Sequence, residues 1–255
     1  ALQPFPSDPQ FQALQHLAKE TPDLIDVSMI NSDLEPARYA IDKLAEATIK
    51  SQNHHYAVAR GIRRLRDAFA DRYAKYFSIS LSAEHEVCVT QGAKDAIIQA
   101  LHVVASRSRK KIVLLTPYYP AHNASALLAG LEVVCVPFAE TEEATLKNLE
   151  NSFLDPEVGA CLLSLPSNPL GMVVTKSFWE NLGKIAATKK IVIINDFVYG
   201  ELAYNETGRV ASALHAKKFG ATVVEAYSLS KAFSLAGWRV AALVGDKDLI
   251  HAVSQ

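Results

Sequence analysis

The sequence has few cysteines and no apolar segment of membrane-spanning length. Its three cysteines, Cys88, Cys135 and Cys161, are odd in number and lie in strand-like apolar runs. This pattern predicts core thiols in a reducing compartment, not a disulfide framework. No apolar run approaches the roughly 20 residues that a transmembrane helix needs, and the first residues show no basic region followed by an apolar one. We therefore expect a cytoplasmic protein without a membrane partner.

The sequence also has almost no net charge. It contains 26 lysines and arginines and 27 aspartates and glutamates, so its formal net charge of -1 gives no electrostatic basis for binding nucleic acid. His54 and His55 are adjacent and have no metal-ligand spacing around them, so we predict polar loop residues there and no metal site. The remaining composition, 49% apolar and 21% charged over 255 residues, is that of a globular protein with a large core.

From about residue 86 the chain alternates between apolar strands and amphipathic helices. The predicted strands are 86–90, 111–116, 131–137, 160–165, 190–195, 221–227 and 240–244. Near-continuous apolar strands separated by helices indicate that both faces of the sheet are covered, so we predict an α/β fold with a mostly parallel sheet. Residues 1–50 are expected to form an N-terminal arm and a helix, and residues 51–255 the large domain.

Polar and aromatic residues follow the predicted strands. Ligands of a parallel sheet bind at the carboxyl ends of its strands, so these residues are the candidates for a site. They comprise a glycine turn, an aromatic ring, an amide, a carboxylate, a phenol, two hydroxyls and a lysine, namely Gly92, Ala93, Lys94, Tyr119, Asn168, Asp196, Tyr199, Ser228, Ser230 and Lys231.

The chemistry of this set suits a phosphorylated aromatic cofactor. A glycine turn that opens a helix, as at Gly92, offers backbone N–H groups to an anion. Asp196 ends an apolar strand, where an unpaired carboxylate is costly, so it needs a cationic or N–H partner such as a protonated ring nitrogen. A lysine amine flanked by hydroxyls, as at Lys231, suits the attachment of a phosphorylated aldehyde as a Schiff base.

Each residue also has a purely structural explanation. Asp196 could pair with a neighbouring lysine, and Tyr119 and Tyr199 could fill core space. Asn168 could belong to a turn, and a glycine could be needed at position 92 only because the backbone there has a positive φ. Their joint occurrence at strand ends, in this order, is what favours a binding site.

The ordered set resembles the class I and II aminotransferases, which are fold-type I pyridoxal 5'-phosphate (PLP) enzymes. The resemblance runs from about Asp26 to the last residue. It implies a three-layer α/β/α large domain with a mostly parallel seven-stranded sheet and PLP as cofactor. The motifs that carry it are Tyr56-(x4)-Gly61-(x3)-Leu65-Arg66, Thr90-x-Gly92-Ala93, Pro117-x-Tyr119-Pro120, Pro166-x-Asn168-Pro169-x-Gly171, Asp196-x-x-Tyr199 and Ser228-x-Ser230-Lys231-(x5)-Gly237-x-Arg239.

The resemblance implies catalytic roles for three residues and ring contacts for two more. Lys231 would hold PLP as a Schiff base and, once substrate has displaced it, would move the proton between the substrate Cα and the cofactor. Asp196 would keep the pyridine nitrogen protonated, which makes the ring an electron sink. Asn168 and the catalytic residue Tyr199 would hydrogen-bond the phenolic oxygen, and Tyr119 would stack on the ring.

The resemblance also implies how the phosphate is held. Its ligands would be the turn at Gly92, the backbone N–H groups of Ala93 and Lys94, and the residues Ser228, Ser230 and Arg239. Tyr56 would reach the phosphate in the neighbouring subunit, which implies a homodimer. His122 falls where some members have a histidine behind the aspartate, although a loop histidine is the simpler expectation.

Two departures from the family's pattern concern the substrate. By alignment Ile30 or its neighbour stands where many members have a glycine beside the substrate carboxylate. The family continues past the position of Arg239 into a small C-terminal domain that supplies an arginine for that carboxylate, whereas this sequence stops at Gln255. We therefore expect a fragment without the small domain.

The activity that the resemblance implies is transfer of an amino group from an amino acid to a 2-oxo acid by a ping-pong mechanism. One alternative is another fold-type I PLP enzyme, such as a C–S lyase, a decarboxylase or a cyclase. The other is a non-catalytic PLP-binding domain of a transcription regulator, which would need a DNA-binding module that residues 1–25 do not contain. The amino donor, the acceptor and the pathway are not predicted.

Overall fold

The computed structural model describes residues 9–25 and 32–255. The chain divides into two compact units, Ala1–Glu35 and Pro36–Gln255. In the first unit the described residues form one helix, α1 (Pro9–Glu20), on which Leu14 and Leu17 are exposed.

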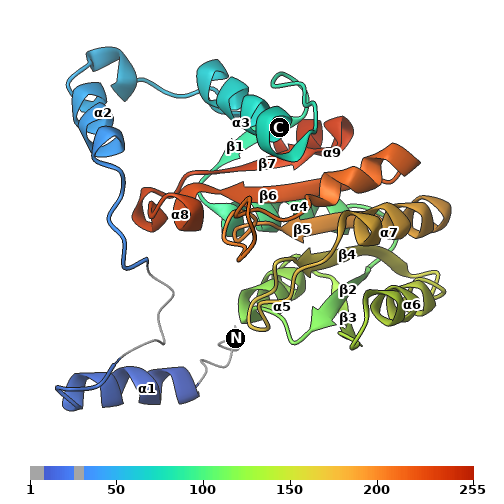
Figure 1. The fold of residues 1–255 in the computed structure, drawn as a ribbon. Helices are drawn as coiled ribbons and strands as arrows, with labels where there is room; N and C mark the ends of the chain where they lie inside the picture. Colours follow the sequence, from blue (N-terminus) through green and yellow to red (C-terminus); the bar gives the residue numbers. More distant parts are fainter. Residues whose placement is uncertain (1–8, 26–31) are drawn as a thin grey trace. The chain divides into compact units, whose positions relative to one another are not determined.

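The second unit is built on a seven-stranded sheet (Figure 1). In spatial order its strands are β1 (Val87–Thr90), β7 (Ala241–Gly245), β6 (Val223–Ser228), β5 (Val192–Asp196), β4 (Val158–Ser164), β2 (Lys111–Thr116) and β3 (Glu132–Pro137). Strand β7 runs antiparallel to its two neighbours, and the other four pairings are parallel. The predicted α/β fold with a mostly parallel seven-stranded sheet is confirmed.

Helices cover both faces of this sheet, which gives three layers. One face buries residues of α3 (Arg63–Phe77), α6 (Glu142–Ser152), α7 (Lys176–Lys189) and the 3-10 helix η2 (Ala213–Phe219). The other buries residues of α4 (Ala93–Ala105), α5 (Pro120–Leu128) and α9 (Lys247–Val253). Helix α2 (Arg38–Thr48) has no buried residue and is drawn apart from both layers in Figure 1. Within the described ranges, every helix is too short or too polar to span a membrane.

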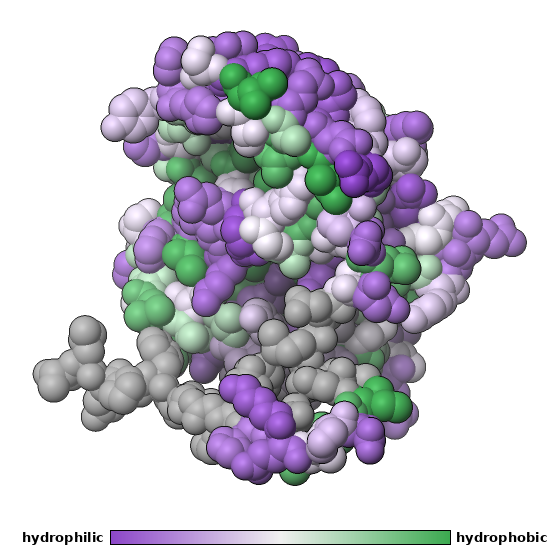
Figure 2. Space-filling view, turned by 90° about the vertical axis from the view of Figure 1, so that its left-hand side faces the viewer, coloured by the Kyte–Doolittle hydropathy of each residue, from purple (hydrophilic) through white to green (hydrophobic). Residues whose placement is uncertain are grey.

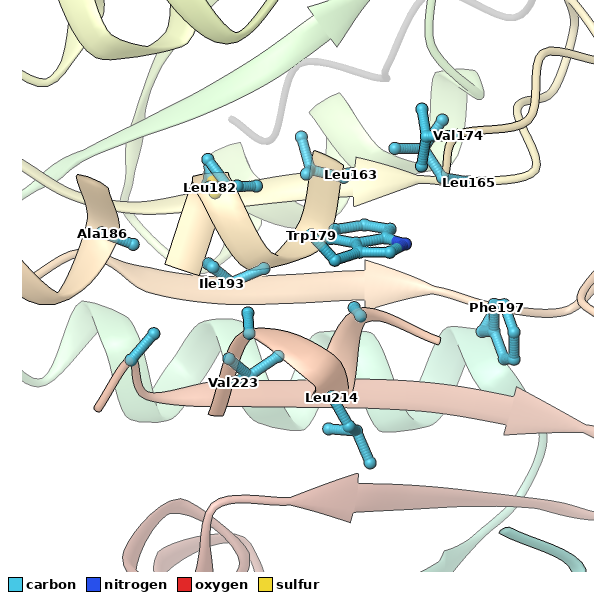
Figure 3. Close-up of a cluster of buried hydrophobic side chains, with 14 of the residues drawn as sticks. Leu163, Leu165, Val174, Trp179, Leu182, Ala186, Ile193, Phe197, Leu214 and Val223 are labelled. Atoms are coloured by element: carbon cyan, nitrogen blue, oxygen red, sulfur yellow. The ribbon is translucent and has the colours of Figure 1, made fainter. Parts of the chain in front are cut away.

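The core between α7 and the sheet explains why the strands are apolar along their whole length. Leu163, Ile193 and Val223 lie on three neighbouring strands, and all three belong to the same buried cluster as Trp179 of α7 (Figure 3). The Trp179 indole donates a hydrogen bond from Nε1 to the Ala211 carbonyl at 3.1 Å, so its polar atom is satisfied as well. Strands covered on both faces need apolar residues at consecutive positions.

Strand direction decides where the polar residues meet. Because β1 and β6 both pair antiparallel with β7, they run the same way as each other and as the parallel strands β2 to β5. Their carboxyl ends therefore share one edge of the sheet, on the side where Figure 1 shows the short helix α8 (Leu229–Ala232). The amino end of β7, which Arg239 precedes, lies at the same edge.

One prediction about the core is wrong. Cys88 and Cys161 are buried as expected, but Cys135 is exposed. Cys135 lies on β3, the last strand in the sheet order, which has only one buried residue, Val136. An edge strand has no neighbour on its outer side, so an apolar sequence there does not guarantee burial.

A carboxylate sits fully buried on β6. Oε1 of Glu225 accepts hydrogen bonds from Tyr73 Oη and Ser212 Oγ, each at 2.7 Å, and Oε2 accepts from Ala213 N at 2.7 Å and Asn195 Nδ2 at 3.0 Å. Burial raises the pKa of Glu225, and these four donors oppose that rise. With two partners on each oxygen, the buried carboxyl group of Glu225 is fully hydrogen-bonded.

We expect Glu225→Leu to lower the free energy of unfolding by about 3 kcal/mol or more, because four buried donors lose their acceptor. Urea unfolding followed by circular dichroism measures the difference. Glu206→Leu is the control, since Glu206 is exposed on a loop and its replacement should change stability by about 0.5 kcal/mol or less. Equal stability of the two variants would contradict a structural role for the Glu225 network.

Candidate active site

The predicted site residues gather at the carboxyl edge of the sheet. Each lies at or just past the end of a strand, except Tyr56, which lies before the first strand, and Arg239, which precedes the antiparallel strand β7. In order of the elements that carry them, they are Gly92 and Ala93 at the start of α4, Tyr119 before α5, Asn168 after β4, Asp196 and Tyr199 at and after the end of β5, and Ser228, Ser230 and Lys231 at the end of β6 and in α8.

Asp196 is buried and has only one of its two oxygens bonded. Its Oδ2 lies 2.9 Å from Nε2 of His122, which is itself buried, and the His122 ring meets the Tyr119 ring edge-on with 5.5 Å between centroids. Its other oxygen, Oδ1, is buried without a hydrogen-bond partner among the residues that the structure describes. Such an oxygen is costly to leave unpaired, so it marks a position for an N–H or cationic group of a ligand.

The structure corrects two simpler expectations about this pair. The partner of Asp196 is a histidine, not a lysine, and His122 lies in the first turn of α5, not in a loop. Pro120 starts α5 directly after Tyr119, so His122 comes three residues after a strand-end residue and turns toward the same edge. That spacing was the signal that could have placed His122 in the site.

Tyr199 and Asn168 form a second polar pair. Asn168 Nδ2 donates to Tyr199 Oη at 3.5 Å. Burial and then the negative charge of Asp196 raise the pKa of Tyr199, and the hydrogen bond from Asn168 opposes them. The phenol therefore stays protonated at neutral pH and can donate a hydrogen bond to a ligand.

Gly92 and Arg239 are in direct contact. Gly92 has φ 93°, and a Cβ built on it would overlap Nη2 of Arg239 and lie 2.7 Å from Cζ. Only glycine lets the guanidinium lie against the backbone at the start of α4, where N–H groups are unpaired. Arg239 Nη1 donates to the Ala236 carbonyl at 2.9 Å. A guanidinium beside a helix N-terminus is a suitable place for an anion.

The side chains of Ser228 and Ser230, which precede Lys231, are hydrogen-bonded to each other. Ser228 Oγ accepts from the backbone N of Ser230 at 3.1 Å, which caps α8, and lies 2.9 Å from Ser230 Oγ. Lys231 follows in the same turn, and partial burial lowers the pKa of its amine.

Three sequence candidates are not joined to this group by a described contact. Tyr56 is fully exposed, at 106% of its reference surface, and the Lys94 side chain is exposed in the first turn of α4. Ile30 lies outside the described residues.

A charged cluster beside the site was not predicted. Arg72 of α3 bonds Glu201, which follows Tyr199 by two residues, and Tyr227, which precedes Ser228. Arg72 and Glu201 are 129 positions apart, and no spacing in the sequence connects them.

Comparison with known proteins identifies the family to which the chain is similar. The family model for aminotransferase class I and II matches residues 22–255. The glutamate-pyruvate aminotransferase AlaC of Escherichia coli strain K12 is 29% identical over 236 residues, which are 91% of this chain and 56% of AlaC. An LL-diaminopimelate aminotransferase of Dehalococcoides mccartyi strain BAV1 is 30% identical over 236 residues, which are 91% of this chain and 59% of that protein.

A solved structure supports the fold alone. A double mutant of Thermus thermophilus aspartate aminotransferase superposes with a TM-score of 0.87 at 23% identity, and the match covers 100% of this chain and 65% of that one. The chain thus spans between 56% and 65% of the length of these three proteins.

Two lysines with opposite pKa shifts allow a test of the site's electrostatics. Partial burial lowers the pKa of Lys231, whereas the hydrogen bond and charge of Glu46, 2.6 Å from Lys43 Nζ, raise the pKa of exposed Lys43. A lower pKa keeps an amine unprotonated, and so reactive, down to a lower pH. We expect competitive acetylation of the cofactor-free protein, read by peptide mass spectrometry across a pH series, to give Lys231 the lower midpoint. Equal midpoints would contradict this account of the Lys231 environment.

Proposed function

The chain belongs to the family of class I and II aminotransferases, and we propose that it is the cofactor-binding part of an aminotransferase that moves an amino group from an amino acid to a 2-oxo acid. Members of this family are PLP-dependent enzymes. In this proposal residues 51–255 are the PLP-binding large domain, and residues 1–50 are an N-terminal arm and helix.

The observation that carries the proposal is the half-bonded carboxylate of Asp196. His122 occupies Oδ2, and Oδ1 is left buried without a partner among the described residues. A protonated pyridine nitrogen is the group that would satisfy Oδ1, and the nearby negative charge would keep that nitrogen protonated. His122 would hold the carboxylate in place from behind.

Arg239 and the start of α4 form a suitable binding site for the phosphate of the cofactor. Arg239 lies against Gly92 at the start of α4, where the backbone N–H groups of Ala93 and Lys94 are the first of the helix. A guanidinium and a helix N-terminus both stabilise an anion. The hydroxyls of Ser228 and Ser230 would complete the phosphate ligands.

Lys231 and Tyr199 would act on the reacting groups. When bound, PLP supplies an electron-withdrawing ring that stabilises negative charge developing on the substrate Cα. Lys231 Nζ would bind the aldehyde carbon covalently and, when released, would take up and give back the Cα proton, a task that its lowered pKa favours. Tyr199 and Asn168 would donate hydrogen bonds to the ring's phenolic oxygen, and the Tyr119 ring would cover one face.

The substrate is proposed only as a class. The three matched proteins are named for glutamate and pyruvate, for LL-diaminopimelate and for aspartate, so their names do not agree on one donor.

We also propose a homodimer in which Tyr56 reaches the neighbouring site. Its full exposure, together with the absence of buried residues on α2, fits a surface that a second copy covers. A cytoplasmic location stays a prediction.

Covalent attachment of PLP to Lys231 tests the cofactor part of the proposal. The purified chain with PLP should be yellow, and borohydride should fix the cofactor to the Lys231 peptide, whereas Lys231→Ala should lose this adduct and stay folded. An amino donor alone should then convert the cofactor of the whole protein to its pyridoxamine form. Release of pyruvate and ammonia would identify a lyase, and an equal adduct in Lys231→Ala would disprove the role of Lys231.

Gly92→Ala tests the proposed phosphate site. The new methyl group would displace the Arg239 guanidinium, so we expect PLP affinity to fall by about tenfold or more, measured by absorbance titration. Gly130→Ala is a matched control, because Gly130 also has a positive φ (80°) but has no atom within 4 Å of an added Cβ. Unchanged affinity in folded Gly92→Ala would show that Arg239 does not bind the phosphate.

A further inference from the structure

Arg72 makes a two-point contact with Glu201 outside the set of proposed cofactor ligands. Its Nε donates to Glu201 Oε1 at 2.7 Å, and its Nη2 donates to Oε2. The same Nε lies 2.6 Å from Tyr227 Oη, and that hydroxyl donates to Glu201 Oε1. Planar two-point pairing is specific to arginine, because a lysine ammonium offers no such fork.

The partners of Arg72 are close in sequence to three proposed cofactor ligands. Glu201 follows Tyr199 by two residues, and Tyr227 directly precedes Ser228. The Arg72 guanidinium also lies 4.7 Å from the ring centroid of Phe233, which follows Lys231 by two residues. One side chain on α3 therefore contacts the segments after β5, at the end of β6 and after α8.

Opposite charges stabilise the contact between Arg72 and Glu201. Burial raises the pKa of Glu201 and pairing with Arg72 and Tyr227 lowers it, with a net decrease, so the carboxylate is ionised. Arg209 Nε lies 3.4 Å from Glu201 Oε2, and its guanidinium is 4.0 Å from the ring centroid of Tyr76. Arg72 is 4.8 Å from the same ring.

The Lys231 segment is only half-buried. Helix α8 has four residues and none is buried, although Leu229 packs against the buried cluster to which α3 also contributes. Leu229 and Phe233 line a cavity of about 400 Å³ together with residues of α3, among them Asp71, Arg72 and Lys75. Figure 2 shows the face on the left-hand side of Figure 1, where α8 lies, and hydrophobic residues reach the surface there among hydrophilic ones. The contact between Arg72 and Phe233 is one of the contacts that hold the end of this segment against α3.

We propose that Arg72 is a positioning residue, which holds the Lys231 segment in place relative to the Tyr199 segment through Phe233 and Glu201. The proposal rests on the proposed function, since it assigns Arg72 a role for the site in which Lys231 and Tyr199 bind the cofactor. A purely stabilising ion pair would raise the melting temperature without affecting that site. A positioning residue also changes cofactor binding, and it does so without contact to the cofactor.

The test compares Arg72→Met with Arg63→Met. Both arginines lie on α3, and Arg63 Nε pairs with Asp67 at 2.8 Å on the exposed side of the helix. For each variant we would measure the PLP dissociation constant, the pH midpoint of the bound cofactor's absorbance and the melting temperature. Hydrogen exchange of residues 199–203 and 229–233 would be measured in the cofactor-free protein.

We expect Arg72→Met to raise the PLP dissociation constant by about tenfold or more, to shift the absorbance midpoint and to speed exchange in both segments. Arg63→Met should leave all three at the wild-type values. Wild-type binding, midpoint and exchange in folded Arg72→Met would overturn the proposal.

Two milder variants cover the case in which Arg72→Met does not fold. Arg72→Lys keeps the charge without the planar fork, and Phe233→Leu keeps the ion pair without the ring contact. Faster exchange of residues 229–233 in either variant supports the proposal, and wild-type exchange in both overturns it. A wild-type protein that forms no reducible adduct at Lys231 would instead disprove the proposed function, and the exchange measurement would still decide whether Arg72 holds the segments.

Discussion

The buried carboxylate of Glu225 connects the core of the sheet to the edge that carries the site. It lies on β6 and accepts a hydrogen bond from Asn195 on β5. Asn195 in turn bonds the backbone of Leu165 in both directions, with its Oδ1 accepting at 3.1 Å and its Nδ2 donating at 3.3 Å. The residue after Asn195 is Asp196, and Asn168 comes three residues after Leu165. A satisfied polar network inside the core therefore fixes the points from which two site residues extend.

Most of the fold could be predicted because both faces of the sheet are covered. Strand β5 is buried at every position, and β4 at all but its last, so residues 192–194 and 158–163 form apolar runs in the sequence. A parallel sheet also brings its carboxyl strand ends to one edge, and for that reason the sequence places Asp196, Asn168 and Ser228 together without any three-dimensional information. The signal for this part of the site was local, because Asp196 and Ser228 end their own strands and Asn168 comes four residues after β4.

The rest depends on relations between segments that are far apart in the sequence. The exposure of Cys135 follows from the spatial order of the strands, which puts β3 at an edge although it is third in the chain. Arg72 meets Glu201 because α3 packs on the face of the sheet that β5 and β6 share. Ion pairs between distant segments have no periodicity, so composition and spacing contain no signal for them.

The site and the core differ in how far their polar groups are satisfied. In the core, both oxygens of Glu225 are fully bonded, whereas Asp196 has an unpartnered oxygen and no described carboxylate pairs with Arg239. Leaving a buried group unpaired costs stability, and a fold keeps such groups only where the surroundings hold them in place. Glu225 and Asn195 supply that support next to Asp196. The two neighbouring acids therefore differ: all hydrogen bonds that Glu225 needs come from the protein, whereas Asp196 has one oxygen without a partner among the described residues, and our proposal assigns that oxygen to a ligand.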